Sequence, residues 1–297
     1  REIEARHTLM DLLLYNYDWF IDHICHFAGI TRFQYKSAAS KSQIYYKSKY
    51  SVIKDKAQLT HCPINTLRKI QRILKRDVFS IFPINEAACG FVRGGSNIKH
   101  VKNHVNCRSI FIGDFVDFFG SVDISLFDAL CKENNVEKKI ARNLRHLCFL
   151  KDNETGRFIF PKGAITSPIL SNAMMYPVDC AIQRLAKKYD FIYSRFVDDI
   201  AISTDKITQS YVLDQIKTEI LALFFSYGFR LHKVYVGPIK PDLEITGIHI
   251  KDKRLVLAEK FHARSAYLER TAPANDPRIL SSKTYIEQVE RKGNEKA

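Results

Sequence analysis

The sequence contains no run of about 18 uninterrupted apolar residues, the length that a membrane-spanning helix needs. Its most apolar N-terminal stretch, residues 9–14, is interrupted by Asp11, so we expect a protein without membrane attachment. The seven cysteines are scattered and never stand in CxxC spacing, which predicts reduced thiols in a cytoplasmic protein. No internal repeat is evident, and the start at Arg1 rather than Met leaves open a longer gene product.

Acidic residues are also in short supply. The chain has 32 Asp and Glu against 46 Lys and Arg, a formal net charge of +14, and the basic excess runs from the N-terminal third to the C-terminus. This charge favours an anionic partner, and nucleic acid is the first candidate because Lys and Arg release counterions condensed on phosphates. Aromatic residues, 12% of the chain, add surfaces on which bases stack. A merely soluble basic protein is the alternative on charge alone.

Apolar periodicity predicts a chain of mixed helices and strands. From Ile64 to Val78, apolar residues follow helical spacing and basic residues occupy the other face, which is either solvated or turned to phosphates. Further helices are predicted near residues 123–133, 137–150, 166–188, 207–227, 258–270 and 283–291, and strands near 109–114, 158–160, 191–203, 229–236 and 244–257. The alternation indicates an α+β fold.

Three aspartates stand out against this background. Asp198 and Asp199 lie between two short apolar runs, where a strand-turn-strand hairpin would place both acids at its tip, and Asp114 ends a β-branched and aromatic strand. Together they would suit two Mg²⁺ ions, which prefer oxygen ligands and serve nucleotidyl transfer. The alternative is structural, because Asp is common in turns, where its carboxylate accepts hydrogen bonds from backbone amides.

Four ordered motifs resemble the polymerase motifs of bacterial reverse transcriptases, above all retron reverse transcriptases and their relatives in phage defence. They are residues 114–119 (DFVDFF), 161–172 (PKGAITSPILSN), 193–200 (YSRFVDDI) and 245–247 (ITG). The resemblance covers roughly residues 50–260 and implies a right-hand polymerase with fingers, a ferredoxin-like palm and a small helical C-terminal thumb. The implied domains are residues 1–107 for N-terminal helices and fingers, 108–257 for the palm, with a fingers insertion around 123–165, and 258–297 for a partial thumb.

The resemblance also implies roles for individual residues. Asp114, Asp198 and Asp199, with the backbone carbonyl of Phe115, would hold the two Mg²⁺ ions, and Lys233 (or His232, one position earlier) would protonate the leaving pyrophosphate. The residues expected at the dNTP are Lys54 and Lys56 at the triphosphate, Phe119 as the steric gate against a 2′-hydroxyl, and Lys162 with Gly163 beneath the nucleotide. The expected nucleic-acid contacts are Phe91, Arg93, Lys99, His104, Thr246 and Gly247.

The implied activity is that of an RNA-directed DNA polymerase that binds a structured noncoding RNA and copies part of it into single-stranded DNA in an antiphage system. The motifs depart from the family at Lys162, where relatives carry Gln, and at Gln58, where they carry Arg. Two alternatives therefore stay open: a protein-primed or untemplated DNA polymerase, and a catalytically vestigial RNA-binding scaffold for an effector. An effector or toxin protein and a second copy of the chain are the further possible partners.

Overall fold

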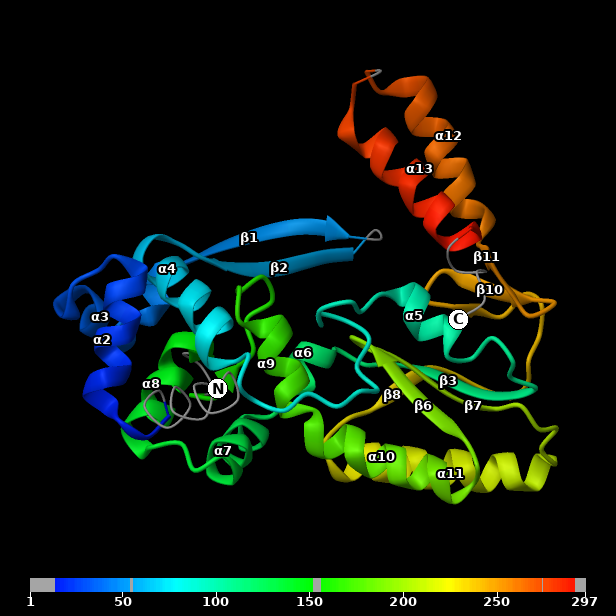
Figure 1. Cartoon of the computed structure of the whole chain (residues 1–297), viewed down its shortest axis with the longest axis horizontal. Coiled ribbons are helices and arrows are strands. Elements are labelled where there is room, and N and C mark those ends of the chain that lie inside the picture. Colours follow the sequence, from blue (N-terminus) through cyan, green and yellow to red (C-terminus); the bar gives the residue numbers. More distant parts are fainter. Residues whose placement is uncertain (1–13, 54–55, 152–155, 274, 292–297) are drawn as a thin grey trace, which may run out of the picture. The chain divides into compact units, whose positions relative to one another are not determined.

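The computed structural model describes residues 14–53, 56–151, 156–273 and 275–291, and the chain divides into two compact units (Figure 1). The first unit consists of Arg1–Asn85 and Asp117–Pro177, and the second of Glu86–Val116 and Val178–Ala297. Each unit therefore contains segments that are far apart in the sequence. Within the described ranges, no helix combines the length and the apolar character needed to cross a bilayer.

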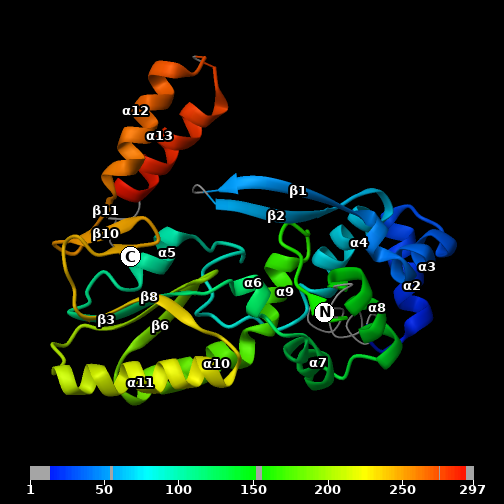
Figure 2. The same cartoon turned by 180° about the vertical axis from the view of Figure 1, so that it is seen from behind.

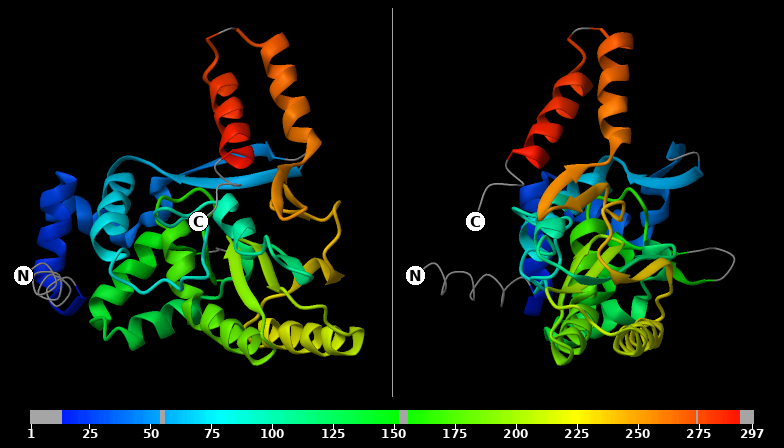
Figure 3. Two further views of the ribbon diagram at one scale, coloured as in Figure 1. Left: turned by 45° about the vertical axis from the view of Figure 1, so that its right-hand side comes forward. Right: turned by 90° about the vertical axis from the view of Figure 1, so that its right-hand side faces the viewer.

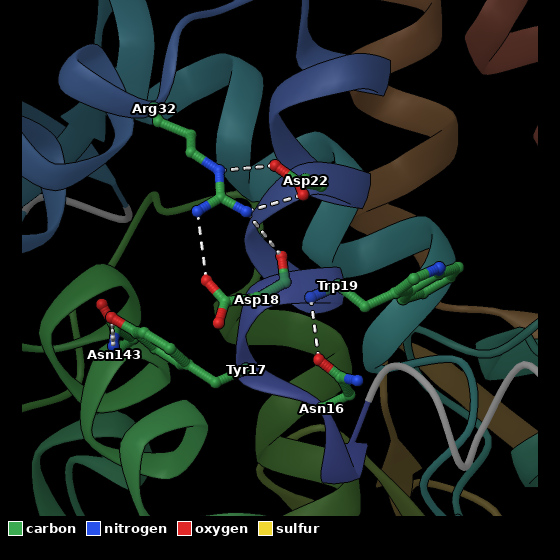
Figure 4. Close-up of polar contacts among 7 residues, drawn as sticks. All are labelled: Asn16, Tyr17, Asp18, Trp19, Asp22, Arg32 and Asn143. Atoms are coloured by element: carbon green, nitrogen blue, oxygen red, sulfur yellow. Dashed lines mark hydrogen bonds and ion pairs between the residues drawn. The ribbon is translucent and has the colours of Figure 1, made fainter.

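Helices dominate the first unit, and short polar side chains define where they begin. The Asn16 side chain accepts a hydrogen bond from the Trp19 amide at 3.0 Å and starts α2, as Figure 4 shows, while Thr31 and Gln34 form a capping box at α3. The elements are α2 (Tyr17–Ala28), α3 (Arg32–Ser40), η1 (Ser42–Tyr45), α4 (Asn65–Ile73), η2 (Leu74–Val78), α6 (Phe118–Ser121), α7 (Ile124–Glu133), α8 (Lys138–Cys148) and α9 (Ser167–Met174).

The first unit also carries a long hairpin formed by β1 (Tyr46–Ile53) and β2 (Lys56–Pro63), which pair antiparallel throughout. The loop that precedes α9 supports this hairpin, because the His61 amide donates to the Lys162 carbonyl at 2.6 Å. A second, shorter pair consists of β4 (Leu150–Lys151) and β5 (Phe158–Ile159).

The second unit is built on an antiparallel sheet with the order β6-β7-β3-β8 among the described residues. Within this unit, leaving aside the segment Asp117–Pro177 that belongs to the first unit, β3 is followed by a helix, by β6 and β7, by a second helix and by β8. This is the ferredoxin-like arrangement that the sequence resemblance implies. The helices α10 and α11 lie along one face of the sheet (Figures 1 and 2). The bounds are α5 (Asn97–Lys102), β3 (Ser109–Phe115), α10 (Tyr176–Lys188), β6 (Ile192–Phe196), β7 (Asp199–Thr204), α11 (Ser210–Ser226) and β8 (Leu231–Pro238).

A small sheet and two long helices complete the second unit at its C-terminal end (Figure 3). The strands β9 (Glu244–Ile245), β10 (Ile248–Lys251) and β11 (Arg254–Leu257) lead into α12 (Glu259–Thr271) and α13 (Pro277–Glu290). Val289 of α13 is fully buried in one apolar cluster with Ile248 of β10 and Ile110 of β3. The last helix is thus anchored to both sheets of its unit.

Two helix boundaries differ from the sequence expectations. The single helix predicted over 166–188 is two helices, α9 and α10, separated at Met175, because the ring of Pro177 leaves no amide for a continuous helical ladder. The last helix begins at Pro277 rather than near 283, since Asp276 caps it by accepting a hydrogen bond from the Arg278 amide at 2.9 Å.

Candidate active site

The sheet of the second unit brings the three aspartates to one end. Asp114 of β3 stands directly opposite Asp199 of β7 in the antiparallel register, and the Phe115 amide donates to the Asp198 carbonyl at 3.0 Å. The link between acids 84 and 85 residues apart in the sequence is therefore made by the backbone ladder itself.

The turn that carries Asp198 is strained. Val197 and Asp198 form the two-residue connection between β6 and β7, and Val197 has a φ of 61°. A β-branched residue rarely adopts this left-handed conformation, which costs on the order of 1–3 kcal/mol and persists only where neighbours enforce it. Gly90 is one such neighbour, because a Cβ at that position would lie 2.7 Å from the Val197 side chain.

A buried ion pair also holds the turn. The Arg195 guanidinium donates to both carboxylate oxygens of Asp179 on α10, at 2.9 and 2.7 Å, and to the Val197 carbonyl at 3.0 Å. Both charged side chains are 0% exposed, and the Tyr193 hydroxyl donates to the same carboxylate at 2.7 Å. Burial alone would lower the pKa of Arg195, but Asp179 outweighs burial and raises it. Arg195 thus stays charged while it fixes the turn.

A network of two histidines and two serines lies beneath the same strands. His104 bonds Ser203 of β7 through Nδ1 at 2.7 Å and Ser194 of β6 through Nε2 at 2.8 Å, and His100 Nδ1 lies 2.7 Å from the Ser194 hydroxyl. Burial lowers the pKa of His104 to about 3 and that of His100 well below its ordinary value. Both rings are therefore neutral and belong to the interior.

A β-bulge places two basic side chains, those of Lys233 and His232, beside Asp114. The pairing of β3 with β8 shifts between Ile112 and Asp114, and the extra residue Lys233 takes a φ of 51°. As a result, Lys233 Nζ lies 2.9 Å and His232 Nε2 lies 3.4 Å from the same oxygen, Asp114 Oδ2. The Asp114 carboxylate raises the pKa of Lys233 most, with smaller contributions from Asp199 and Asp198, so all three acids act on this ammonium group.

The acids fit a divalent cation in one specific respect. Asp114 Oδ1 is buried without a hydrogen-bond partner, although the Asp114 side chain as a whole is 18% exposed. An oxygen of this kind is costly unless a cation or water satisfies it. Among the residues with described placement, no three His, Cys, Asp or Glu side chains converge closely enough to hold a metal ion. The acids share a strand end, with one oxygen of Asp114 held by Lys233 and the other left open.

Lys162, Gly163 and Phe119, which the sequence predicts at the nucleotide, are described with their side chains and lie in the first unit. Lys162 Nζ bonds Asp117 Oδ1 at 2.6 Å, and Gly163 has a φ of 98° where a Cβ would lie 3.4 Å from Cys62 Sγ. Phe119 is half-buried and stacks on Phe160 with ring centroids 5.8 Å apart. Lys54 lies outside the described residues, and Lys56 is described only by its backbone, which pairs with Ile53 in the hairpin.

Two of the predicted nucleic-acid contacts form an internal junction instead of an open surface. The Asn97 side chain, at the start of α5, donates to the Thr246 carbonyl at 3.3 Å and to the Tyr285 hydroxyl at 2.5 Å. It thereby links the residue after β9 to α13. Gly247 is required there, because its φ is 86° and a Cβ would lie 2.8 Å from the Phe261 ring. The ITG segment therefore sits where the small sheet meets the last two helices.

The other predicted contacts differ in exposure. Phe91, Arg93 and Lys99 are exposed, and Phe91 has a φ of 58°. His104, by contrast, is almost fully buried in its serine network, so its placement fits support of the strands rather than direct contact with nucleic acid.

Sequence reasoning missed the supporting residues Asp179, Arg195 and Asp117. For two of them the sequence holds a weak signal, which is their closeness to a predicted metal ligand. Arg195 stands three residues before Asp198, and Asp117 stands three residues after Asp114. No local pattern marks Asp179, whose partner is 16 residues away on another element.

A ferredoxin-like sheet that places carboxylates at one end defines the palm of a right-hand polymerase. Residues 46–234, more than half of the chain, match the family model described as reverse transcriptase (RNA-dependent DNA polymerase). The chain therefore belongs to the reverse transcriptase family, which confirms the resemblance found in its motifs.

Curated relatives refine this assignment. The chain is 27% identical over 188 residues to the retron Mx65 reverse transcriptase of Myxococcus xanthus, which covers 59% of this chain and 43% of the relative. It is 26% identical over 190 residues to the retron Ec83 reverse transcriptase of Escherichia coli, which covers 60% of each chain. The family type predicted from the motifs, a bacterial retron-type reverse transcriptase, is thus confirmed. The chain spans about half the length of these relatives.

A solved structure confirms the predicted fold. The chain is similar to a structure of telomerase from Candida albicans in complex with the TWJ fragment of telomeric RNA, with a TM-score of 0.50 and 12% identity. The similarity covers 82% of this chain and 54% of the telomerase chain. At 12% identity, this structural similarity supports the fold and no conclusion about function.

Proposed function

We propose that this chain is the polymerase part of an RNA-directed DNA polymerase that binds a structured noncoding RNA and copies part of it into single-stranded DNA, in an antiphage system. The observation that carries the proposal is the register of Asp114 with Asp199, beside a turn strained to present Asp198. Strain of this kind is typical of sites where geometry serves chemistry. The retron relatives support the RNA template and the DNA product as its partners.

Each site residue has a defined task in this proposal. Asp114, Asp198 and Asp199, with the Phe115 carbonyl, would hold two Mg²⁺ ions, and the open Oδ1 of Asp114 supports a cation there. When bound, the ions would activate the attacking 3′-hydroxyl and neutralise the leaving pyrophosphate. Lys233, already beside Asp114, would give a proton to that pyrophosphate, with His232 as the second group within reach.

The nucleotide would be held by residues of the first unit. Phe119, stacked on Phe160, presents a half-buried ring suited to exclude a 2′-hydroxyl, whereas the neighbouring Phe118 is 3% exposed and packs in the interior. In domain terms, we assign residues 1–107 with the insertion around 123–165 to the fingers, 108–257 to the palm and 258–297 to part of the thumb.

A primer-extension assay tests the proposal. The purified chain is given Mg²⁺, a labelled primer on a heteropolymeric RNA template, and either dNTPs or rNTPs. Product that depends on the template, on Mg²⁺ and on dNTPs supports the proposal. Product that forms without template or primer indicates the untemplated or protein-primed alternative. Tight RNA binding without product indicates a vestigial scaffold.

A further inference from the structure

Aromatic side chains form a ladder along one face of α2. Trp19, His23 and Phe27 recur at every fourth position, with ring centroids 5.0 Å apart for the first pair and 4.6 Å for the second. The Phe27 side chain is 51% exposed, and the Arg76 guanidinium lies 4.9 Å from its ring centroid. We call Trp19, His23, Phe27 and Arg76 the aromatic ladder.

A π-helical turn builds one side of the ladder. α4 continues into η2, where the Phe79 amide bonds the Leu74 carbonyl five residues back at 2.8 Å. Asp77 of this turn is largely buried and receives hydrogen bonds from Arg76 Nη2 at 2.6 Å and from His23 Nε2 at 2.7 Å. One carboxylate thus fixes the ring of one helix and the guanidinium of the next before any ligand arrives.

Positive charge continues from the ladder along the neighbouring helix. α2 packs against α4, and exposed basic residues continue from α4 into η2. They are Arg68, Lys69 and Arg72 on α4, and Lys75 and Arg76 on η2. The acidic residues Asp18 and Asp22 on α2 are already paired with Arg32, at 3.1 and 2.6 Å. Figure 4 shows Trp19 directed away from this cluster. Aromatic rings on which bases could stack thus lie beside the basic row, which favours the interpretation that this row faces phosphates.

We propose that the aromatic ladder and the basic face of α4 and η2 bind a single-stranded segment of RNA, with unpaired bases stacked on Trp19 and Phe27 and phosphates on the basic row. The ligand class rests on the proposed function, since the template RNA is the expected partner. The combination of stacking surfaces with a positively charged track is what single-stranded nucleic acid requires. The guanidinium of Arg76 adds a planar surface of its own.

The chain provides its own reporter, because Trp19 is its only tryptophan. The full chain is titrated with a single-stranded RNA oligonucleotide without dNTPs or Mg²⁺, so that the result does not depend on synthesis. We expect saturable quenching of the Trp19 emission, with less quenching by duplex RNA of equal length. Equal quenching by the duplex would overturn base stacking at this site, as would RNA binding, seen by anisotropy, without any quenching.

Variants separate the two parts of the site by anisotropy of labelled RNA. Phe27→Leu keeps apolar volume but removes the ring, and we expect affinity to fall about tenfold, since stacking on one aromatic side chain contributes roughly 1–3 kcal/mol. Replacement of both Arg72 and Lys75 by Gln should lower the dependence of log affinity on log salt by roughly 0.7 for each phosphate that is no longer neutralised. Both of these side chains are exposed, so the double replacement should leave the fold intact.

Matched controls lie on the second unit. Phe225→Leu removes a ring that is 64% exposed on α11, and Arg184→Gln with Lys187→Gln makes the same charge change on α10. If either control weakens single-stranded RNA binding as much as its counterpart, the site assignment is overturned. Primer extension is followed in parallel: quenching without extension rejects the polymerase proposal and keeps this site, and extension without quenching does the reverse.

Discussion

Two hairpins of the described residues, β6–β7 and β1–β2, are built in opposite ways. In the β6–β7 hairpin, Ser194, Arg195, Ala201 and Ile202 are fully buried, and its turn is held by a guanidinium and by a glycine. In the β1–β2 hairpin, by contrast, Tyr50 is 74% exposed and the lysines of β1 point into solvent. The β6–β7 hairpin thus holds its acids beside a strained backbone, whereas the β1–β2 hairpin carries exposed lysines without such packing among its described residues.

The contrast teaches which property each hairpin supplies. The metal chemistry proposed above would need oxygen ligands held in nearly one position. The surroundings of Asp198 enforce a backbone at Val197 that a β-branched residue rarely adopts, which would meet this need. The exposed lysines of β1 supply positive charge, which would suit recognition of the RNA phosphates in the proposed function. The following changes test this division, from the largest expected effect to the smallest.

Asp198→Asn should have the largest effect. It keeps the shape of the turn but removes a negative charge, so we expect primer extension to fall by about 10³-fold or more while RNA affinity changes less than about twofold. Single-turnover extension and anisotropy measure the two quantities. Asp205→Asn, an exposed acid just beyond β7, is the control and should leave both unchanged. Retained extension in Asp198→Asn would remove the metal role of this residue.

Asp179→Asn should destabilise the fixed hairpin itself. The change leaves Arg195 buried without its counter-charge, which typically costs about 3–5 kcal/mol in the free energy of unfolding. Asp190→Asn makes the same chemical change in an exposed pair with Lys206 and should cost far less, because solvent screens that pair. Denaturant unfolding compares them, and similar costs for both would contradict the buried anchor.

Low pH should destabilise the same hairpin through His104, whose ring bonds Ser194 and Ser203 of its two strands. The folded state holds the pKa of His104 near 3, below the value of about 6.5 expected for an unfolded chain, so folding excludes a proton that the unfolded state binds. The contribution of His104 to the free energy of unfolding is therefore fully present above about pH 6.5 and falls as the pH is lowered. At pH 5 the loss from this residue is about 2 kcal/mol. Unfolding of His104→Gln at several pH values should show a shallower dependence.

Phe119→Ala tests the nucleotide side of the first unit. If Phe119 is the gate, the preference for dNTP over rNTP should fall by roughly 10- to 100-fold, because removal of one packing surface changes discrimination by about 1–3 kcal/mol. Phe118→Ala is the control: it should leave discrimination unchanged and reduce stability, since the Phe118 ring is buried. Ratios of kcat/KM for dNTP and rNTP measure the effect.

The smallest effect is expected in the exposed hairpin. Replacing Lys47 and Lys49 with Gln should change the free energy of unfolding by no more than about 0.5 kcal/mol, since both side chains are exposed. The same change should reduce the salt dependence of RNA affinity, by roughly 0.7 for each phosphate that these lysines neutralise. A large loss of stability would show that this hairpin is as firmly integrated as its counterpart.

The sequence predicts the β3 and β6–β7 strands well because strong β-branched and aromatic runs end at acids. The ordered motifs point to the three acids that the sheet places at one end. It does not predict the split between α9 and α10, where one proline competes with a long helical pattern. Nor does it reveal the Lys162–Asp117 pair or the bulge at Lys233, because both depend on where distant strands align. The ambiguity between His232 and Lys233 has a physical basis, since both reach Asp114.

The close approach of Gly90 to Val197 has a consequence for the order of folding. Ala88 forms a parallel bridge with Arg195, and the Cys89 amide bonds the Arg195 carbonyl at 2.7 Å, across roughly a hundred residues of intervening chain. During synthesis, residues 87–90 emerge long before their partner strand and must wait for it. We therefore expect the acid-bearing turn to be among the last parts to acquire its native backbone, so that a nascent or truncated polypeptide carries the aspartates without their arrangement.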